Sequence, residues 1–247
     1  GAYRYQFAKD WDGDHFTETP KLQRYNISPQ LFFDLSKYAK MNIGGNYTSE
    51  DRLGGAMEYI NNKADSVYNY FEKNSSGHIS SNFKFEYDFE KAGKLTVKNA
   101  FNYFNRDLKI PYYFFKGRQM ASASEINYHF ILKRHDVVVG VDFRTDKFDE
   151  GNDSSLAKRS YSFLTAGVFA QYIYNFSDKT TLEAGFRIDY NNVYKVYPLP
   201  HIAVRQKCND IFSTRLNVGM GYKLPTIFQD ESEEARFINV QGIAASV

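Results

Sequence analysis

Apolar and polar residues alternate along most of the chain. Between residues 182 and 190, one set consists of Leu182, Ala184, Phe186, Ile188 and Tyr190, and the other of Glu183, Gly185, Arg187 and Asp189. Strict alternation over eight or more residues predicts a β-strand with one apolar and one polar face, because helical spacing does not produce it. About eleven segments have this pattern, and we expect strands over residues 2–9, 22–36, 40–50, 79–90, 94–106, 123–133, 136–146, 161–176, 180–190, 199–207 and 210–224.

The predicted connections alternate in length. Tight ones are expected at residues 36–40, 91–94, 133–136, 177–179 and 207–210, and long ones at 9–21, 51–77, 107–122, 147–160 and 191–198. If each strand pairs antiparallel with the next, all tight turns lie at one end of the sheet, as in outer-membrane barrels. Several segments also exceed the usual five or six residues of a soluble strand and match the roughly 9–11 residues that cross a bilayer.

Alternation alone does not say which face points inward. With the apolar face inside, the chain would resemble a small soluble barrel of the lipocalin type. The chain contains 20 Tyr and 22 Phe, yet its mean hydropathy is −0.55. Long strands, sorted loops and rings on the apolar face favour a lipid-facing apolar surface, with aromatic girdles at the membrane interfaces. A closed barrel also satisfies every backbone polar group within lipid.

Composition narrows the function classes. The 247 residues carry a net charge of +2 without long runs of one sign, so no nucleic-acid partner is expected. Cys208 is the single cysteine, which excludes an internal disulfide and a cysteine zinc site. The first residues do not have the pattern of a signal peptide, and no run of about 18 apolar residues predicts a transmembrane helix. No metalloprotease, nucleophile-elbow or P-loop motif occurs, so we expect neither an enzyme nor a cofactor.

Several stretches resemble the barrel of TonB-dependent outer-membrane receptors. They include GVFAQYIYNFSDKTTLEAGFRIDY at residues 167–190 and RLNVGMGYKLPTIFQ at residues 215–229, where residues 221–228 would emerge into an extracellular loop. Residues 24–55 are similar to barrel hairpins of this family, and residues 11–21 to one of its extracellular loops. The resemblance implies a 22-stranded barrel that is closed by an N-terminal plug domain. It also implies a bacterial outer-membrane importer of iron chelates, cobalamin or glycans that is powered by the TonB complex.

The chain departs from this plan, because it shows about eleven strands and no plug or TonB-binding segment. We therefore interpret residues 1–247 as part of an all-β transmembrane antiparallel barrel whose missing plug would contact TonB, with outer-membrane lipid and a small-molecule or glycan ligand as partners. One alternative is a complete small barrel that acts as a porin or adhesin. Another is a soluble β-sandwich binding module.

Three sets of residues are candidates for a functional site. Charged residues on the polar faces would line the lumen and contact the plug or ligand, or only pair with one another: Lys84, Glu86, Asp142, Arg144, Glu183, Arg187, Asp189 and Arg215. A ring-rich stretch in a predicted extracellular loop would stack on a ligand, with a cation for an acidic group, or pack on itself: Tyr112, Tyr113, Phe114, Phe115 and Arg118, with Tyr59 as a weaker candidate. Asp10, Asp12 and Asp14, with Glu18 nearby, would bind Ca²⁺ or form a solvated acidic loop.

Overall fold

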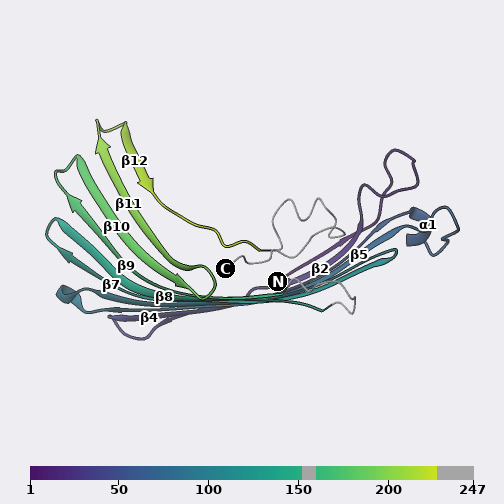
Figure 1. Ribbon diagram of the computed structural model, residues 1–247, viewed down its shortest axis with the longest axis horizontal. Coiled ribbons are helices and arrows are strands. Elements are labelled where there is room, and N and C mark those ends of the chain that lie inside the picture. The colour runs from purple at the N-terminus through teal and green to yellow at the C-terminus, as the bar shows by residue number, and fades with distance from the viewer. Residues whose placement is uncertain (152–159, 227–247) are drawn as a thin grey trace.

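One antiparallel sheet, curved into an open trough, makes up almost the whole molecule (Figure 1). The computed structural model describes residues 1–151 and 160–226. Its strands are β1 (Ala2–Gln6), β2 (Lys21–Ile27), β3 (Gln30–Asp34), β4 (Ala39–Gly55), β5 (Phe71–Asp88), β6 (Lys94–Ile110), β7 (Tyr113–Leu132), β8 (His135–Glu150), β9 (Tyr161–Asn175), β10 (Thr180–Asn191), β11 (Lys195–Lys207) and β12 (Ser213–Gly219). A short helix α1 (Met57–Ile60) and a 3₁₀ turn η1 (Glu90–Ala92) lie in connections.

Each strand pairs with its neighbours along the chain, in the order β1-β2-β4 and onward to β12, while β3 pairs only with β4. Residues 22–36, which we expected as one strand, are interrupted near Pro29. β2 pairs with residues 47–53 of β4, and β3 continues along the same edge to residues 40–44. Proline has no N–H for a ladder, so a break there is expected. The break accounts for twelve strands where the pattern predicted about eleven.

The tight turns all lie at one end of the sheet, as predicted, between β3 and β4, β5 and β6, β7 and β8, β9 and β10, and β11 and β12. At the other end, the prediction of a long loop is wrong at two places. Residues 107–122 are the ends of β6 and β7, joined by Pro111 and Tyr112, and residues 192–194 alone join β10 to β11. Residues 107–110 still alternate, but the apolar Leu108 and Ile110 lie on the concave face, whereas the charged Asp107 and Lys109 lie on the convex face, and backbone pairing continues the strand.

The two faces of the sheet differ in chemistry, and the register is uniform from β1 to β12, so each side chain keeps its face across the strands. Val168 and Phe186 are 56% and 49% exposed, whereas Asp142 and Asp189 on the opposite face are 8% and 1% exposed. The segment that follows β12 runs through the hollow of the trough (Figure 1). Tyr222 of this segment donates a hydrogen bond to Asp189. The polar face is therefore the concave one.

This distribution reverses that of a soluble protein, in which large apolar side chains are buried. Near the tight turns the convex face also carries a belt of rings: Tyr87, Phe89, Tyr128, Phe130, Tyr172, Tyr174 and Phe176, with neighbouring centroids 4.6 to 6.4 Å apart. Such girdles mark a membrane interface. A single layer with its apolar face outward excludes the soluble sandwich and the lipocalin-like barrel, and it confirms the transmembrane β-fold.

The sheet is not closed. Within the described residues, β1 and β12 each have a neighbour on one side only, which leaves a row of backbone groups at both edges. None of the helices among the described residues has the length and apolarity needed to cross a membrane.

Candidate functional site in the concave face

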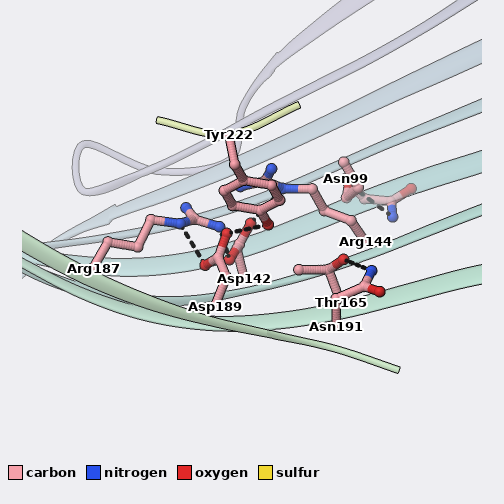
Figure 2. Close-up of polar contacts among 9 residues, drawn as sticks. Asn99, Asp142, Arg144, Thr165, Arg187, Asp189, Asn191 and Tyr222 are labelled. Carbon is pink, nitrogen blue, oxygen red and sulfur yellow. Dashed lines mark hydrogen bonds and ion pairs between the residues drawn. The ribbon is translucent and has the colours of Figure 1, made fainter. Parts of the chain in front are cut away.

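An ion-pair network on the concave face joins β8 and β10 around two buried carboxylates, Asp142 and Asp189. Arg187 donates from Nη2 to Asp142 Oδ1 at 2.5 Å and from Nε to Asp189 Oδ1 at 2.6 Å. Arg144 donates from Nε to Asp142 Oδ2 at 2.7 Å. Figure 2 shows these side chains converging over the sheet. Two guanidinium groups thus compensate two buried carboxylates through charge-assisted hydrogen bonds.

Gly167 makes this network possible. It lies on β9 directly between Asp142 and Asp189, so the three residues form one cross-strand row. A Cβ atom at Gly167 would collide with Oδ1 of both carboxylates and approach Arg187 Nη2 to 2.9 Å. The absence of a side chain on the middle strand therefore lets one arginine bridge carboxylates that are two strands apart.

A tyrosine from outside the sheet completes the network. The Tyr222 hydroxyl donates to Asp189 Oδ2 at 2.7 Å, and its ring stacks on Tyr197 of β11 at a centroid distance of 4.0 Å and an interplanar angle of 6°. Residues 220–226 are not a strand, and they cross the concave face (Figure 1). The expectation that residues 221–228 leave the barrel as an extracellular loop is therefore wrong for residues 221–226; residues 227 and 228 lie outside the described part of the chain.

Asn191, which is fully buried, is the last residue of β10 at the long-loop end. Its side-chain Nδ2 donates to Thr165 Oγ1 at 2.9 Å (Figure 2). Its Oδ1 accepts from the backbone N–H groups of Val193 and Tyr194. These bonds fix the turn between β10 and β11. The network and this turn together link β8, β9 and β10 to the start of β11 through side-chain hydrogen bonds and ion pairs.

All eight charged residues predicted to line a lumen lie on the concave face, and each one has an oppositely charged neighbour. Beyond the central network, Glu183 pairs with Arg215 at 2.8 Å, and Glu86 pairs with Lys84 at 3.0 Å and Lys94 at 2.5 Å. The interpretation that these residues pair with one another is therefore correct in the structure. Contact with a plug or a ligand stays a prediction.

The ring-rich stretch does not form one wall, because it is strand rather than loop. Tyr113 and Phe115 lie on the concave face of β7, whereas Phe114 and Arg118 alternate onto the convex face. Tyr112 is at the tip of the hairpin, fully exposed, with a φ of 65° that bulky residues rarely adopt. Tyr59 belongs to α1 and stacks on Phe71 at 4.3 Å. The expected cluster is thus divided between two faces of the sheet and a turn.

The concave face has a different aromatic cluster, which the sequence analysis missed. Rings of adjacent strands follow one another with centroid distances of 4.7 to 6.4 Å across Phe115, Phe148, Tyr161, Phe163 and Tyr194. The cluster lies near the long-loop end of β7, β8 and β9. Apart from Tyr161 and Phe163, these residues are far apart in the sequence. Only the pairing of neighbouring strands brings their rings together.

The acidic residues of the loop between β1 and β2 do gather. One carboxylate oxygen from each of Asp10, Asp12, Asp14 and Glu18 lies within 4.8 Å of the others. The same carboxylates accept backbone hydrogen bonds, including Gly13 N to Asp10 at 2.7 Å and Trp11 N to Glu18 at 2.8 Å. The Gly13 bond is the main cause that lowers the pKa of Asp10. These bonds explain the loop's shape, and Ca²⁺ binding stays a prediction.

Comparisons with known proteins agree with this geometry. Residues 3–242 match the family model described as TonB dependent receptor-like, beta-barrel. The siderophore receptor PirA from Pseudomonas aeruginosa superposes with a TM-score of 0.68 at 11% identity, over 85% of this chain and 35% of that one. PirA from Acinetobacter baumannii gives 0.65 at 17% identity, over 83% and 34%.

The ferric enterobactin receptor PfeA of P. aeruginosa, as its G324V mutant, gives a TM-score of 0.66 at 12% identity, over 90% of this chain and 36% of that one. The chain thus spans about a third of the length of the solved structures that it matches. No curated protein sequence matches it.

Proposed function

Since this chain belongs to the TonB-dependent receptor-like β-barrel family, we propose that it forms part of the wall of an active importer in the bacterial outer membrane. Its place in that membrane follows from the family and from the apolar convex face. The remainder of a barrel of about 22 strands would pair with the open edges of β1 and β12, and a plug domain would fill the concave side. Energy would reach the plug through the TonB complex, so the wall itself has a passive role.

The observation that carries this proposal is the open sheet with paired charges on its concave face. A complete small barrel would bring its first and last strands together, whereas β1 and β12 stay unpaired with each other among the described residues. The porin or adhesin alternative is therefore less well supported. The family is one of receptors, and we assign the chain a transport role without a catalytic one.

For the ligand we propose an iron chelate that contains aromatic rings, in preference to cobalamin or a glycan. In the concave aromatic cluster, Phe115, Phe148 and Phe163 are buried, and the partly exposed rings of Tyr161 and Tyr194 would offer stacking surface near the long-loop end, where an incoming ligand would first meet the wall. The matched solved structures are named as siderophore and ferric enterobactin receptors, which supports this ligand class.

The test is uptake of ⁵⁵Fe-labelled catecholate and hydroxamate chelates by cells that lack or express the full-length receptor, each with TonB present or deleted. We expect uptake that needs both the receptor and TonB, and no uptake when residues 1–247 are expressed alone. Uptake that persists without TonB would support a porin, and uptake by residues 1–247 alone would contradict the proposal. Growth on cobalamin or glycans, measured in parallel, would correct the ligand class.

A further inference from the structure

Exposed basic residues gather at two neighbouring tight turns. Lys133 and Arg134 form the whole turn between β7 and β8, and Lys179 lies in the turn between β9 and β10. The turns are in contact, because the Arg134 carbonyl accepts from Asn175 N at 2.9 Å and Arg134 Nη1 donates to the Phe176 carbonyl at 3.3 Å. Within the described residues, the ammonium groups of Lys133 and Lys179 have no partner.

His135 extends these charges onto the convex face. Its ring stacks on Tyr172 and Tyr174 at centroid distances of 5.8 and 5.0 Å, and its Nδ1 shares a 2.5 Å hydrogen bond with the Tyr172 hydroxyl. These contacts hold the imidazole against the belt of rings, and in the described part of the chain Nε2 has no partner. We call Lys133, Arg134, His135 and Lys179 the basic cluster.

Few carboxylates offset this cluster. Asp178 is the acidic residue of the two turns, so three cations face one carboxylate before His135 is counted. Asp136, the next acidic residue along β8, lies on the concave face and pairs with His129 there. The two turns therefore carry an excess of positive charge at their exposed tips.

The other tight turns do not have this excess. Their basic residues have acidic neighbours: Lys40 pairs with Asp34 at 3.8 Å, Lys207 pairs with Asp210 at 2.8 Å, and Lys91 directly follows Glu90. The basic cluster is thus a local feature of the β7–β10 wall, and it adjoins the rings that mark a membrane interface.

Small side chains lead from the basic cluster into the lipid-facing wall. Val139, four residues along β8 from His135, pairs directly with Ala170 on the convex face, and Tyr128 and Phe186 flank this pair in the same row. The distance from His135 to Val139 is about 13 Å at the rise of an antiparallel strand. An extended acyl chain covers this length, and over the valine and alanine it would contact both flanking rings.

We propose that the basic cluster and the Val139–Ala170 pair bind an anionic glycerophospholipid of the periplasmic leaflet. Tight turns of such barrels face the periplasm, and basic residues at a membrane surface attract anionic headgroups. The phosphate pairs with Lys133, Arg134 and Lys179, His135 Nε2 bonds a phosphate or glycerol oxygen, and an acyl chain lies over Val139 and Ala170. The site is at the opposite end of the wall from the long loops, so it does not depend on which ligand the receptor imports.

The experiment uses the full-length receptor, purified in mild detergent and stripped of lipid. It is incubated with phosphatidylglycerol, cardiolipin or phosphatidylethanolamine of the same acyl chains, and native mass spectrometry measures the lipid bound per protein. We expect phosphatidylglycerol or cardiolipin to bind about tenfold more tightly than phosphatidylethanolamine, because only the first two are anionic. The tighter of the two anionic lipids shows whether the site takes one phosphate or two. Equal binding of all three lipids would overturn the proposal.

A charge-reversed pair tests the headgroup contacts. Lys133→Glu with Lys179→Glu changes two side chains that make no bond among the described residues, and it should abolish the preference for anionic lipid. The control is Lys37→Glu with Lys91→Glu, which makes the same change of charge at two exposed positions of other tight turns. This control should keep the preference. If both pairs weaken anionic-lipid binding equally, general electrostatic attraction explains it and the proposal fails.

A second pair of variants tests the acyl chain. Ala170→Phe places a ring where the chain would lie, and Ala166→Phe is the control on the same strand and face, four residues toward the long-loop end. Binding of phosphatidylglycerol should fall several-fold in Ala170→Phe alone, and equal binding by both variants would refute the acyl-chain position. Heat modifiability on gels verifies that every variant is folded, so a loss of binding is not a loss of structure.

Discussion

Tyr222 donates a 2.7 Å hydrogen bond from its hydroxyl to Asp189 Oδ2, which joins the segment after β12 to the long-loop end of β10. Asp189 is 1% exposed, and its other oxygen is bonded by Arg187. One carboxylate therefore holds both the ion-pair network of the wall and the segment that crosses the concave face.

Replacing Tyr222 by Phe should release this segment while keeping the ring stack on Tyr197. A hydrogen bond to a charged group contributes about 1.5–3 kcal/mol, so we expect faster amide exchange in residues 220–226 and a stability loss of that order. Hydrogen-exchange mass spectrometry of the full-length protein measures it. In a protein that already carries Asp189→Asn, the Tyr222→Phe replacement should cause little further loss of stability. If the two losses of stability add up instead, the two residues are not coupled.

Gly167→Ala should destabilise the barrel by about 2–4 kcal/mol. The new methyl group would displace the carboxylates of Asp142 and Asp189, which the guanidinium groups hold in place. The unfolding midpoint in denaturant measures the change. Gly185→Ala is the control: it faces the same side on the next strand, and its nearest contacts would be ordinary at 3.8 Å. Equal midpoints for the two variants would refute the steric role of Gly167.

Arg187→Ala should cost about 3–5 kcal/mol, because it leaves Asp189 buried without a cationic partner. Arg215→Ala removes the partner of Glu183, but Arg215 is 52% exposed, and such pairs contribute about 0–1 kcal/mol. Unfolding measurements on both variants compare the two environments. An equally small loss of stability in both variants would show that burial does not strengthen the ion pairs of Arg187.

Val168→Lys should impair insertion and lower stability by about 2–4 kcal/mol, since it places a charge on the lipid-facing wall. Gln171→Lys, on the concave face of the same strand, should be tolerated, because Glu183 lies next to it. Folding yield into lipid vesicles, followed by heat modifiability, separates the two. The opposite order would reverse the orientation of the sheet.

The acidic loop should change with pH. Hydrogen bonds from backbone N–H groups, Gly13 first, hold the pKa of Asp10 below its ordinary value of 3.8. The ordered loop is therefore fully stabilised above that value and loses this contribution as the pH falls through the lowered pKa. The fluorescence difference between the native protein and Trp11→Phe should report the transition in acid. Asp10→Asn should remove it, and an unchanged titration would exclude Asp10 as its origin.

The sequence alone determined the strands, the separation of tight and longer connections, and the polarity of each face. These properties are local, because a strand repeats every two residues and Phe83 or Arg187 keeps its side whichever strand is its neighbour. The same logic failed at residues 107–122 and 191–198, where apolar residues such as Leu108, Phe115 and Tyr197 lie on the concave face and backbone pairing continues the strands.

Tertiary structure decided everything that depends on register. Asp142, Gly167 and Asp189 are far apart in the chain, and they meet because antiparallel pairing places them in one row. The aromatic cluster arises in the same way. The alternating pattern also does not say which face of the sheet points inward. Only the curvature of the sheet and the position of Tyr222 show that charges line the hollow and rings face the membrane.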